Sequence, residues 1–199
     1  MTAKAQTLLT QARKTLLTPY GLDVGDLTRV IGKIMTHQVD YADVYFQYSR
    51  SEAWSLEEGI VKAGSFSIDE GVGVRALAGE KTAFAYSDDI GAQALDVAAT
   101  AVRAIAAAGQ ERRVPALRRR SGRHLYLPQD PIASLDAASK VAMLERLEAL
   151  ARAEDPRVTQ VMAHLAGEYE VILVAGSDGR LAADIRPLVR VSLTVIVEE

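Results

Sequence analysis

The spacing of apolar residues between Asp40 and Tyr86 constrains the fold more than any other feature of the chain. Within this region apolar side chains recur at every second position in short segments, which is typical of strands with one buried face. The segments are separated by a turn between Tyr48 and Trp54, and by Glu58-Gly59, Asp69-Glu70-Gly71 and Gly79-Glu80. We therefore expect five closely spaced strands in an antiparallel meander.

An amphipathic helix is expected directly after the meander. Beyond Ser87-Asp88-Asp89 the apolar residues recur at intervals of three and four from Ile90 to Ala108, and Gly109 follows as a terminating residue. The apolar stripe of this helix is rich in alanine, which allows close approach to a sheet. We therefore expect the helix to pack on the meander.

Three further helices and a second group of strands complete the predicted fold. The helices cover about residues 3–17, 24–37 and 136–153, and Asp23 is a candidate N-cap for the second. The strands cover 157–166, 169–175, 180–184 and 189–197, with a turn at residues 176–179. The predicted fold class is α+β, with an antiparallel strand meander and packed helices, then a second helix and a second set of antiparallel strands.

We expect one domain over residues 1–199. Its parts are a helical lead-in at 1–38, the meander with its helix at 40–108, a basic loop at 109–124, and a helix with strands at 125–199. The last strand alternates regularly from Val189 to Val197 and reaches Glu199 without a polar tail. A terminal strand can end a domain, so this ending alone leaves a complete domain and a truncated chain as equal alternatives.

Composition and charge narrow the classes of partner. Of 199 residues, 49% are hydrophobic and 25% charged, as in ordinary globular proteins. A net charge of −3 gives no overall attraction to nucleic acid or anionic lipid. The sequence contains no cysteine, no secretory signal and no apolar run near the ~20 residues of a membrane-spanning helix. We expect a soluble, cytoplasmic protein that binds neither membrane nor nucleic acid.

The basic loop at residues 109–124 contains six arginines around Pro115. It lacks the interleaved aromatic residues that stack on bases. We interpret it as a solvated linker, and a nucleic-acid contact in this loop is the weaker alternative.

The patterns of catalytic and metal-binding proteins are missing from the sequence. His37, His124 and His164 lie far apart, and no His-Glu-x-x-His spacing is present. No Gly-x-Ser-x-Gly elbow occurs either. We predict no catalytic residue and no metal ligand in this chain.

One short motif gives a candidate for substrate binding. Gly71-Val72-Gly73-Val74-Arg75-Ala76 matches a relaxed dinucleotide fingerprint, but that fingerprint requires a helix to open at the glycines, and here they begin a strand. Glycines inside a strand instead indicate a bulge or a close approach of the backbone. Arg75 shares the face of Gly71 and Gly73, so these three residues are the candidate site for a carboxylate or a peptide C-terminus. A surface ion pair of Arg75 is the alternative.

Four blocks of sequence resemble the amino-terminal part of the TldD/PmbA family, whose members are also described as modulators of DNA gyrase. The blocks are Asp40-Tyr41-Ala42-Asp43-Val44-Tyr45-Phe46-Gln47, residues 71–75 with 79–86, residues 155–158, and residues 182–190. They occur in the family's order from about Leu16 to Glu199.

The resemblance implies the amino-terminal portion of a zinc metallopeptidase. Family members are longer, and their second half carries a His-Glu-x-x-x-His zinc motif and a cysteine ligand, neither of which occurs in this sequence. The family relation implies that the chain is inactive alone, binds no cofactor, and helps to hold peptide and to assemble with a TldE/PmbA partner. Zinc, with the motif glutamate as proton acceptor, is expected only in the absent C-terminal domain.

Two hypotheses remain open at this point. As a fragment of a longer peptidase, the chain should expose apolar surface near Val189–Val197 and self-associate. As a stand-alone protein or peptide interaction module without peptidase activity, it should be monodisperse. Under either hypothesis an antiparallel sheet edge can take an extended peptide, although the sequence does not identify the edge.

Overall fold

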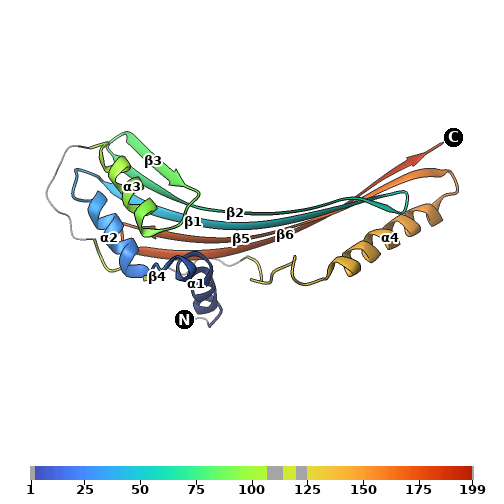
Figure 1. Ribbon diagram of the computed structural model, residues 1–199, viewed down its shortest axis with the longest axis horizontal. Helices are drawn as coiled ribbons and strands as arrows, with labels where there is room; N and C mark the ends of the chain where they lie inside the picture. Colours follow the sequence, from blue (N-terminus) through green and yellow to red (C-terminus); the bar gives the residue numbers. More distant parts are fainter. Residues whose placement is uncertain (1–2, 107–113, 120–124, 199) are drawn as a thin grey trace. The chain divides into compact units, whose positions relative to one another are not determined.

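The computed structural model describes residues 3–106, 114–119 and 125–198, and it confirms the α+β class (Figure 1). The elements are α1 (Ala3–Leu16), the 3-10 helix η1 (Thr18–Tyr20), α2 (Val24–Ile34), β1 (Tyr41–Glu57), β2 (Ile60–Ala78), β3 (Lys81–Ser87), α3 (Ala92–Arg103), β4 (Arg118–Arg119), α4 (Ala137–Glu154), β5 (Val158–Gly176) and β6 (Arg180–Val197). The strands have the order β3-β2-β1-β5-β6-β4. No helix among the described residues is long and apolar enough to span a membrane.

The predicted number of strands is wrong, because the strands are longer than their apolar patterns. β1 and β2 replace the first four predicted strands, and Asp69-Glu70-Gly71, predicted as a turn, lies inside β2. The apolar alternation lapses at Asp69-Glu70-Gly71, where two acidic residues and a glycine are typical of a turn, yet the strand continues through them. The turns at Glu58-Gly59 and Gly79-Glu80 are confirmed.

The second group of strands is likewise merged into two. β5 joins residues 157–166 with 169–175, and β6 runs through Pro187 to join 180–184 with 189–197. Among the described residues β6 is paired on its outer side only at Arg180 and Leu181, by β4. Pro187 therefore lies where an edge strand needs no N–H donor on that side, which is where a sheet tolerates proline.

Part of the basic loop lies outside the described residues, including His124. Within the described part, Arg118 and Arg119 form β4, parallel to β6, and the Arg118 N–H donates to the Gly179 carbonyl at 2.7 Å. The prediction of an entirely irregular loop is therefore wrong. A short strand of two arginines has no apolar alternation to reveal it.

The described chain forms two compact units, and each unit is built from three separate segments. Unit 1 comprises Met1–Tyr48, Asp69–Leu125 and Val171–Ile185, and unit 2 comprises Ser49–Ile68, Tyr126–Glu170 and Arg186–Glu199. The strands β1, β2, β5 and β6 each contribute residues to both units.

The core of unit 1 lies between one sheet face and two helices. The helices α2 and α3 contact each other, and α3 contacts β3 (Figure 1). The predicted packing of α3 on the meander is therefore confirmed, although the helix begins at Ala92 and ends at Arg103, short of the predicted Ala108. The buried residues include Leu27, Val30, Ile31 and Ile34 of α2, Leu95, Ala98, Ala99 and Val102 of α3, Ala42, Val44 and Phe46 of β1, and Val72, Val74 and Ala76 of β2.

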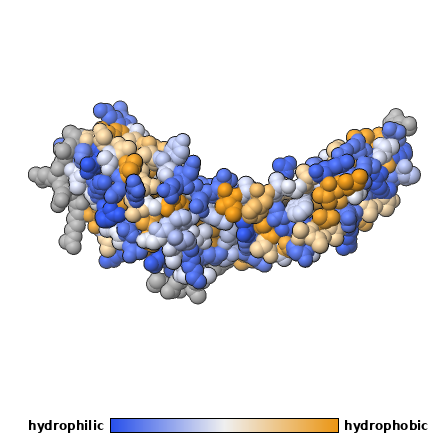
Figure 2. Space-filling view, viewed as in Figure 1, coloured by the Kyte–Doolittle hydropathy of each residue, from blue (hydrophilic) through white to orange (hydrophobic). Residues whose placement is uncertain are grey.

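The core of unit 2 lies between α4 and its strands. It contains Leu56, Leu144, Ala163 and Leu165, with Trp54, Met143 and Leu147 packed against it. The hairpin loop between β1 and β2 is attached to α4 by polar contacts, since the Gly59 N–H donates to Glu148 at 2.8 Å and Arg152 donates to Glu58 at 2.8 Å. Figure 2 shows orange hydrophobic surface over the part of the molecule that holds α4.

Candidate functional site

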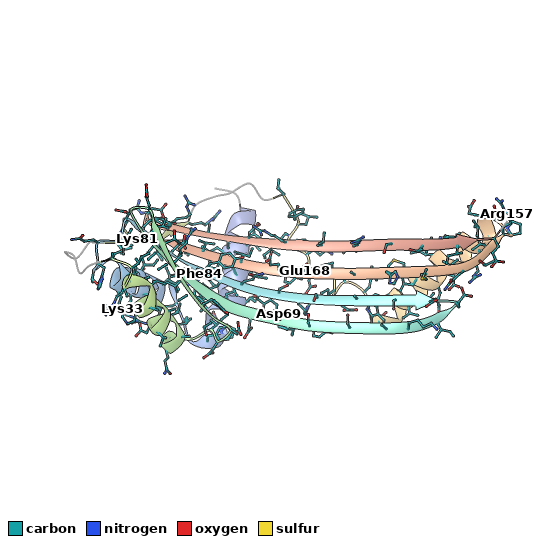
Figure 3. All side chains as sticks on the ribbon, turned by 90° about the horizontal axis from the view of Figure 1, so that it is seen from above. Lys33, Asp69, Lys81, Phe84, Arg157 and Glu168 are labelled. Carbon is teal, nitrogen blue, oxygen red and sulfur yellow. The ribbon has the colours of Figure 1, made fainter. Side chains whose placement is uncertain are left out.

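Unit 1 contains an open pocket of about 310 Å³ beside the outermost strand, β3. This volume is at the lower end of the range for small-molecule sites, so it suits one side chain or a small ligand. The lining residues are Tyr45, Gln47, Asp69, Glu70, Gly71, Val72, Gly73, Phe84, Tyr86, Ser87 and Asp88. Figure 3 shows two of them, with Asp69 on β2 and Phe84 on β3.

Strand alternation places most of the pocket on the sheet face opposite the buried core. On β2, Val72 and Val74 point into the core, so Gly71 and Gly73 lie on the other face. The antiparallel register pairs Gly73 with Tyr86 and Arg75 with Phe84, which brings both aromatic residues of β3 to that same face. The two β2 glycines and the two β3 aromatics therefore form adjoining parts of one surface.

The two glycines create space that any other residue would fill. A Cβ added at Gly73 would lie 2.9 Å from two ring carbons of Phe84, and one added at Gly71 would lie 2.8 Å from the Ser87 carbonyl oxygen. Real Cβ atoms do not approach other atoms so closely. The close approach predicted for these strand glycines is therefore found, by a ring at Gly73 and by backbone at Gly71.

Two exposed aromatic rings form one wall of the pocket. Phe84 is 63% exposed and Tyr86 is 74% exposed, although both are large rings. Their centroids lie 6.2 Å apart with an interplanar angle of 23°, which is a stacked arrangement. Exposed, paired aromatic residues beside a pocket are typical of surfaces that bind a ligand.

The acidic residues of the pocket differ in their surroundings. Asp69 and Asp88 are exposed, and no ion pair involves either within the described part of the chain. Glu70 is partly buried and accepts a hydrogen bond from the Tyr20 hydroxyl at 2.6 Å. Burial and this hydrogen bond raise the pKa of Tyr20 to about 12, so the phenol stays protonated and anchors the carboxylate at neutral pH.

Arg75 lies on the same strand face as the two glycines but does not line the pocket. Its guanidinium donates to both carboxylate oxygens of Asp43, at 3.2 and 2.5 Å. The hydrogen bonds and the charge of Asp43 raise the pKa of Arg75, so the guanidinium stays charged. The structure thus groups Gly71 and Gly73 at a pocket and pairs Arg75 with Asp43, as the ion-pair alternative predicted. Substrate binding by the three residues stays a prediction.

The histidines do not come together in the described residues. The Nδ1 atom of His37 lies 2.8 Å from the Ala106 carbonyl, and His164 is exposed on β5. No group of three or more histidine, aspartate or glutamate side chains in the described ranges is arranged to hold a metal ion.

The sequence prediction missed the aromatic and acidic walls of the pocket. The sequence does contain a signal that would have identified the aromatic wall. It is the alternation in Ala83-Phe84-Ala85-Tyr86, which puts small residues on one face of β3 and large aromatic residues on the other. Because a helix packs closely against alanine, the alanine face is the covered one, and the aromatic face remains open.

Unit 2 has a smaller, mainly apolar pocket of about 200 Å³. Trp54, Leu165 and Val191 contribute apolar surface, and Lys140 and Glu52 form an ion pair at 2.8 Å in its wall. Every described polar atom of this pair has a partner, because Lys140 also donates to the Ile132 carbonyl and the Trp54 indole donates to Glu52. We therefore interpret the pair as a structural contact and not as a site for a ligand.

Comparison with protein families matches two successive segments to one family. Residues 42–108 match the PmbA/TldA metallopeptidase domain 1, and residues 130–199 match the PmbA/TldA metallopeptidase central domain. The Metalloprotease TldD homolog of Haemophilus influenzae is 47% identical over 195 residues, which cover 96% of this chain and 40% of that protein. The homolog of Buchnera aphidicola subsp. Schizaphis graminum is 39% identical over 186 residues, which cover 94% of this chain and 38% of that protein. The chain thus spans about 40% of the length of these relatives.

Solved structures share the fold. A Bacteroides thetaiotaomicron protein assigned as a modulator of DNA gyrase aligns with a TM-score of 0.66 at 12% identity, over 87% of this chain and 41% of that one. TldE from Thermococcus kodakarensis aligns with a TM-score of 0.59 at 17% identity, over 88% of this chain and 39% of that one. The two family models and the TldD homologs confirm the family resemblance predicted from the four sequence blocks. The chain belongs to the PmbA/TldD metallopeptidase family, in which it corresponds to domain 1 and the central domain.

Proposed function

We propose that this chain holds an extended peptide for a PmbA/TldD metallopeptidase, with the outer edge of β3 and the adjoining unit 1 pocket as the binding surface. The main support for this proposal is that the edge strand β3 lies beside a pocket lined by exposed aromatic residues. An edge strand presents unpaired N–H and C=O groups that an added peptide strand can use. Within the described residues, no strand pairs with the outer side of β3.

The geometry of β3 suits this mode of binding. Its seven residues, Lys81–Ser87, can pair with a peptide of similar length. Alternate side chains of an added strand point to the same sheet face as Phe84 and Tyr86, so one peptide side chain can enter the pocket while the backbone pairs with β3. Main-chain hydrogen bonds then supply affinity, and the pocket supplies selectivity.

Backbone N-methylation of the peptide tests this mode directly. In strand addition, only alternate peptide N–H groups face β3, so N-methylation in one register should abolish binding and N-methylation in the other should not. Fluorescence anisotropy with a labelled hexapeptide and the whole 199-residue chain measures both. Equal tolerance of the two registers, or no binding of the parent peptide, would contradict the proposal. Amide hydrogen exchange should show new protection in residues 81–87 when the parent peptide is bound.

The zinc ion and the general base are proposed to lie in a part of the metallopeptidase outside these 199 residues, and a TldE/PmbA-type protein is the proposed partner. The supporting observations are that the chain spans about 40% of its curated relatives and that a TldE shares its fold. The chain alone, supplied with zinc, is expected to cleave no peptide, and it is expected to co-elute with a TldE-type protein in size-exclusion chromatography. Peptide cleavage by the chain alone, or separate elution, would count against this assignment.

A further inference from the structure

The charged residues that line the unit 1 pocket are Asp69, Glu70 and Asp88, and all three are acidic. No lysine or arginine is among the described lining residues. Asp69 lies on the same face of β2 as Gly71, and Asp88, which follows the end of β3, lines the same pocket. Both carboxylates therefore border the pocket together with the aromatic residues. Since neither forms an ion pair in the described part of the chain, their negative charge is not balanced within it.

Arg75, a cation on that face, is already neutralised. Arg75 is opposite Phe84 in the β2–β3 register, but its charge is paired with Asp43 at 2.5 Å. The third acidic residue of the lining, Glu70, faces Tyr20 through its hydrogen bond. Among the described residues that line the pocket, the charges without an ion pair or a tyrosine partner are therefore the two carboxylates of Asp69 and Asp88.

The aromatic wall attracts the same class of ligand. The faces of Phe84 and Tyr86 carry the negative part of the ring quadrupole, which attracts an ammonium or guanidinium group. The alkyl stem of a lysine or arginine can also lie along an apolar ring while its charged end reaches a carboxylate. A pocket of about 310 Å³ is large enough for one such side chain.

We infer that this pocket selects a positively charged side chain, lysine or arginine, in the peptide that the chain holds. The inference rests on the proposed peptide-holding function and adds the chemistry of one subsite. A neutral apolar side chain gains the contact with the rings but nothing from Asp69 and Asp88. An acidic side chain is repelled by both carboxylates.

A series of hexapeptides with blocked termini tests the inference, since blocking removes the α-ammonium group as an alternative cation. The peptides differ only at one central position, which carries lysine, arginine, norleucine or glutamate, and calorimetry measures their binding to the whole 199-residue chain. Lysine and arginine peptides are expected to bind about tenfold more tightly than the norleucine peptide, from one cation–π contact and one carboxylate. The glutamate peptide is expected to bind most weakly.

Matched variants locate the subsite. The double variant Asp69→Asn with Asp88→Asn, and separately Phe84→Leu, should each bring the lysine peptide close to the norleucine peptide. Glu80→Gln removes an exposed charge from the nearby turn outside the pocket, and Phe66→Leu removes a ring of similar exposure on unit 2, so neither should change the preference. Circular dichroism checks that each variant is folded, as expected for exposed positions.

The outcomes separate this inference from the proposed function. Norleucine and lysine peptides of equal affinity would overturn the cationic subsite and leave peptide holding intact. A lysine preference that survives both pocket variants would also overturn it, because the charge would then be recognised elsewhere. No binding of any peptide in the series would contradict peptide holding itself.

Discussion

At the scale of single residues, the buried ion pair of unit 2 combines charge with complete hydrogen bonding. Lys140 donates to both carboxylate oxygens of Glu52, at 2.8 and 3.0 Å, and to the Ile132 carbonyl at 2.8 Å. The side chains are only 8% and 14% exposed. Burial alone would raise the pKa of Glu52, but the hydrogen bonds from Lys140 and Trp54 outweigh it and lower that pKa. The Glu52 carboxyl group is therefore ionised at neutral pH.

Replacing Lys140 by methionine should destabilise the protein by about 3–5 kcal/mol at pH 7, because it leaves a buried carboxylate without its cation. In the parent, the lowered pKa of Glu52 stabilises the fold above the unfolded-state pKa near 4.5, and this contribution is lost as pH falls through the folded-state pKa. In Lys140→Met the pKa of Glu52 should instead be raised by burial. The loss of stability relative to the parent should therefore be smaller at low pH, where Glu52 becomes protonated. Urea unfolding at pH 7 and pH 5 measures both effects.

Two further variants control for this result. Adding Glu52→Gln to Lys140→Met should recover part of the lost stability, since no charge remains buried. Arg29→Met breaks a pair with Asp96 whose side chains are 48% and 43% exposed, and it should cost less than about 1 kcal/mol. A loss in Lys140→Met no larger than that in Arg29→Met would show that the buried pair has no special weight.

Sequence patterns at this scale identified some pocket residues and not others. Gly71 and Gly73 were found because glycine inside a strand is unusual and demands a spatial reason. Phe84 and Asp88 are not unusual at their positions in the sequence. An aromatic residue in a strand is normally a core residue, and an aspartate after a strand is normally a solvated turn residue. Their role depends on which face α3 covers, and that is a tertiary property.

At the scale of elements, the helices were predicted more accurately than the strands. Asp23 is the N-cap of α2, as predicted, and it forms a capping box with Asp26. The Asp23 carboxylate accepts from the N–H groups of Gly25 and Asp26, at 2.6 and 3.1 Å. The signals that end a helix are local, so they are readable from the sequence. A polar break in an apolar pattern, such as Asp69-Glu70-Gly71 inside β2, does not show from the sequence whether the strand ends there or continues.

Asp23→Ala should lower the free energy of unfolding by about 1 kcal/mol, because it leaves two N–H groups at the start of α2 without their acceptor. The expected loss is measurable by chemical unfolding followed by circular dichroism. Asp23→Ser keeps a capping oxygen and should retain most of the stability. If the serine variant lost as much as the alanine variant, the cap would not be the source of the effect.

At the scale of the whole molecule, the outstanding surface feature is the apolar part of β6 in unit 2. Seven of its residues are each at least 41% exposed: Leu188, Val189, Val191, Leu193, Val195, Ile196 and Val197. Within the described chain β4 pairs only with the start of β6, so this stretch is also an edge. The exposed apolar surface predicted near Val189–Val197 is therefore present.

An exposed apolar edge of this length should make the chain self-associate as its concentration rises. Sedimentation velocity over a hundredfold concentration range is expected to show larger species, and these should diminish in the double variant Val191→Lys with Leu193→Lys. Val97→Lys changes an exposed valine on α3 of unit 1 and should leave association unchanged. A parent chain that stays monomeric throughout would favour the stand-alone interaction module.

The division into two units has a consequence for how this protein can be taken apart. Each unit takes segments from the beginning, middle and later part of the chain, and the strands β1, β2, β5 and β6 cross from one unit to the other. The family ranges 42–108 and 130–199 are contiguous, so neither range contains a complete unit. In the strand order β1 is hydrogen-bonded to β5, so a gene segment encoding only one range would yield a polypeptide with one strand left without its neighbour. Recombination between relatives should therefore exchange both ranges together.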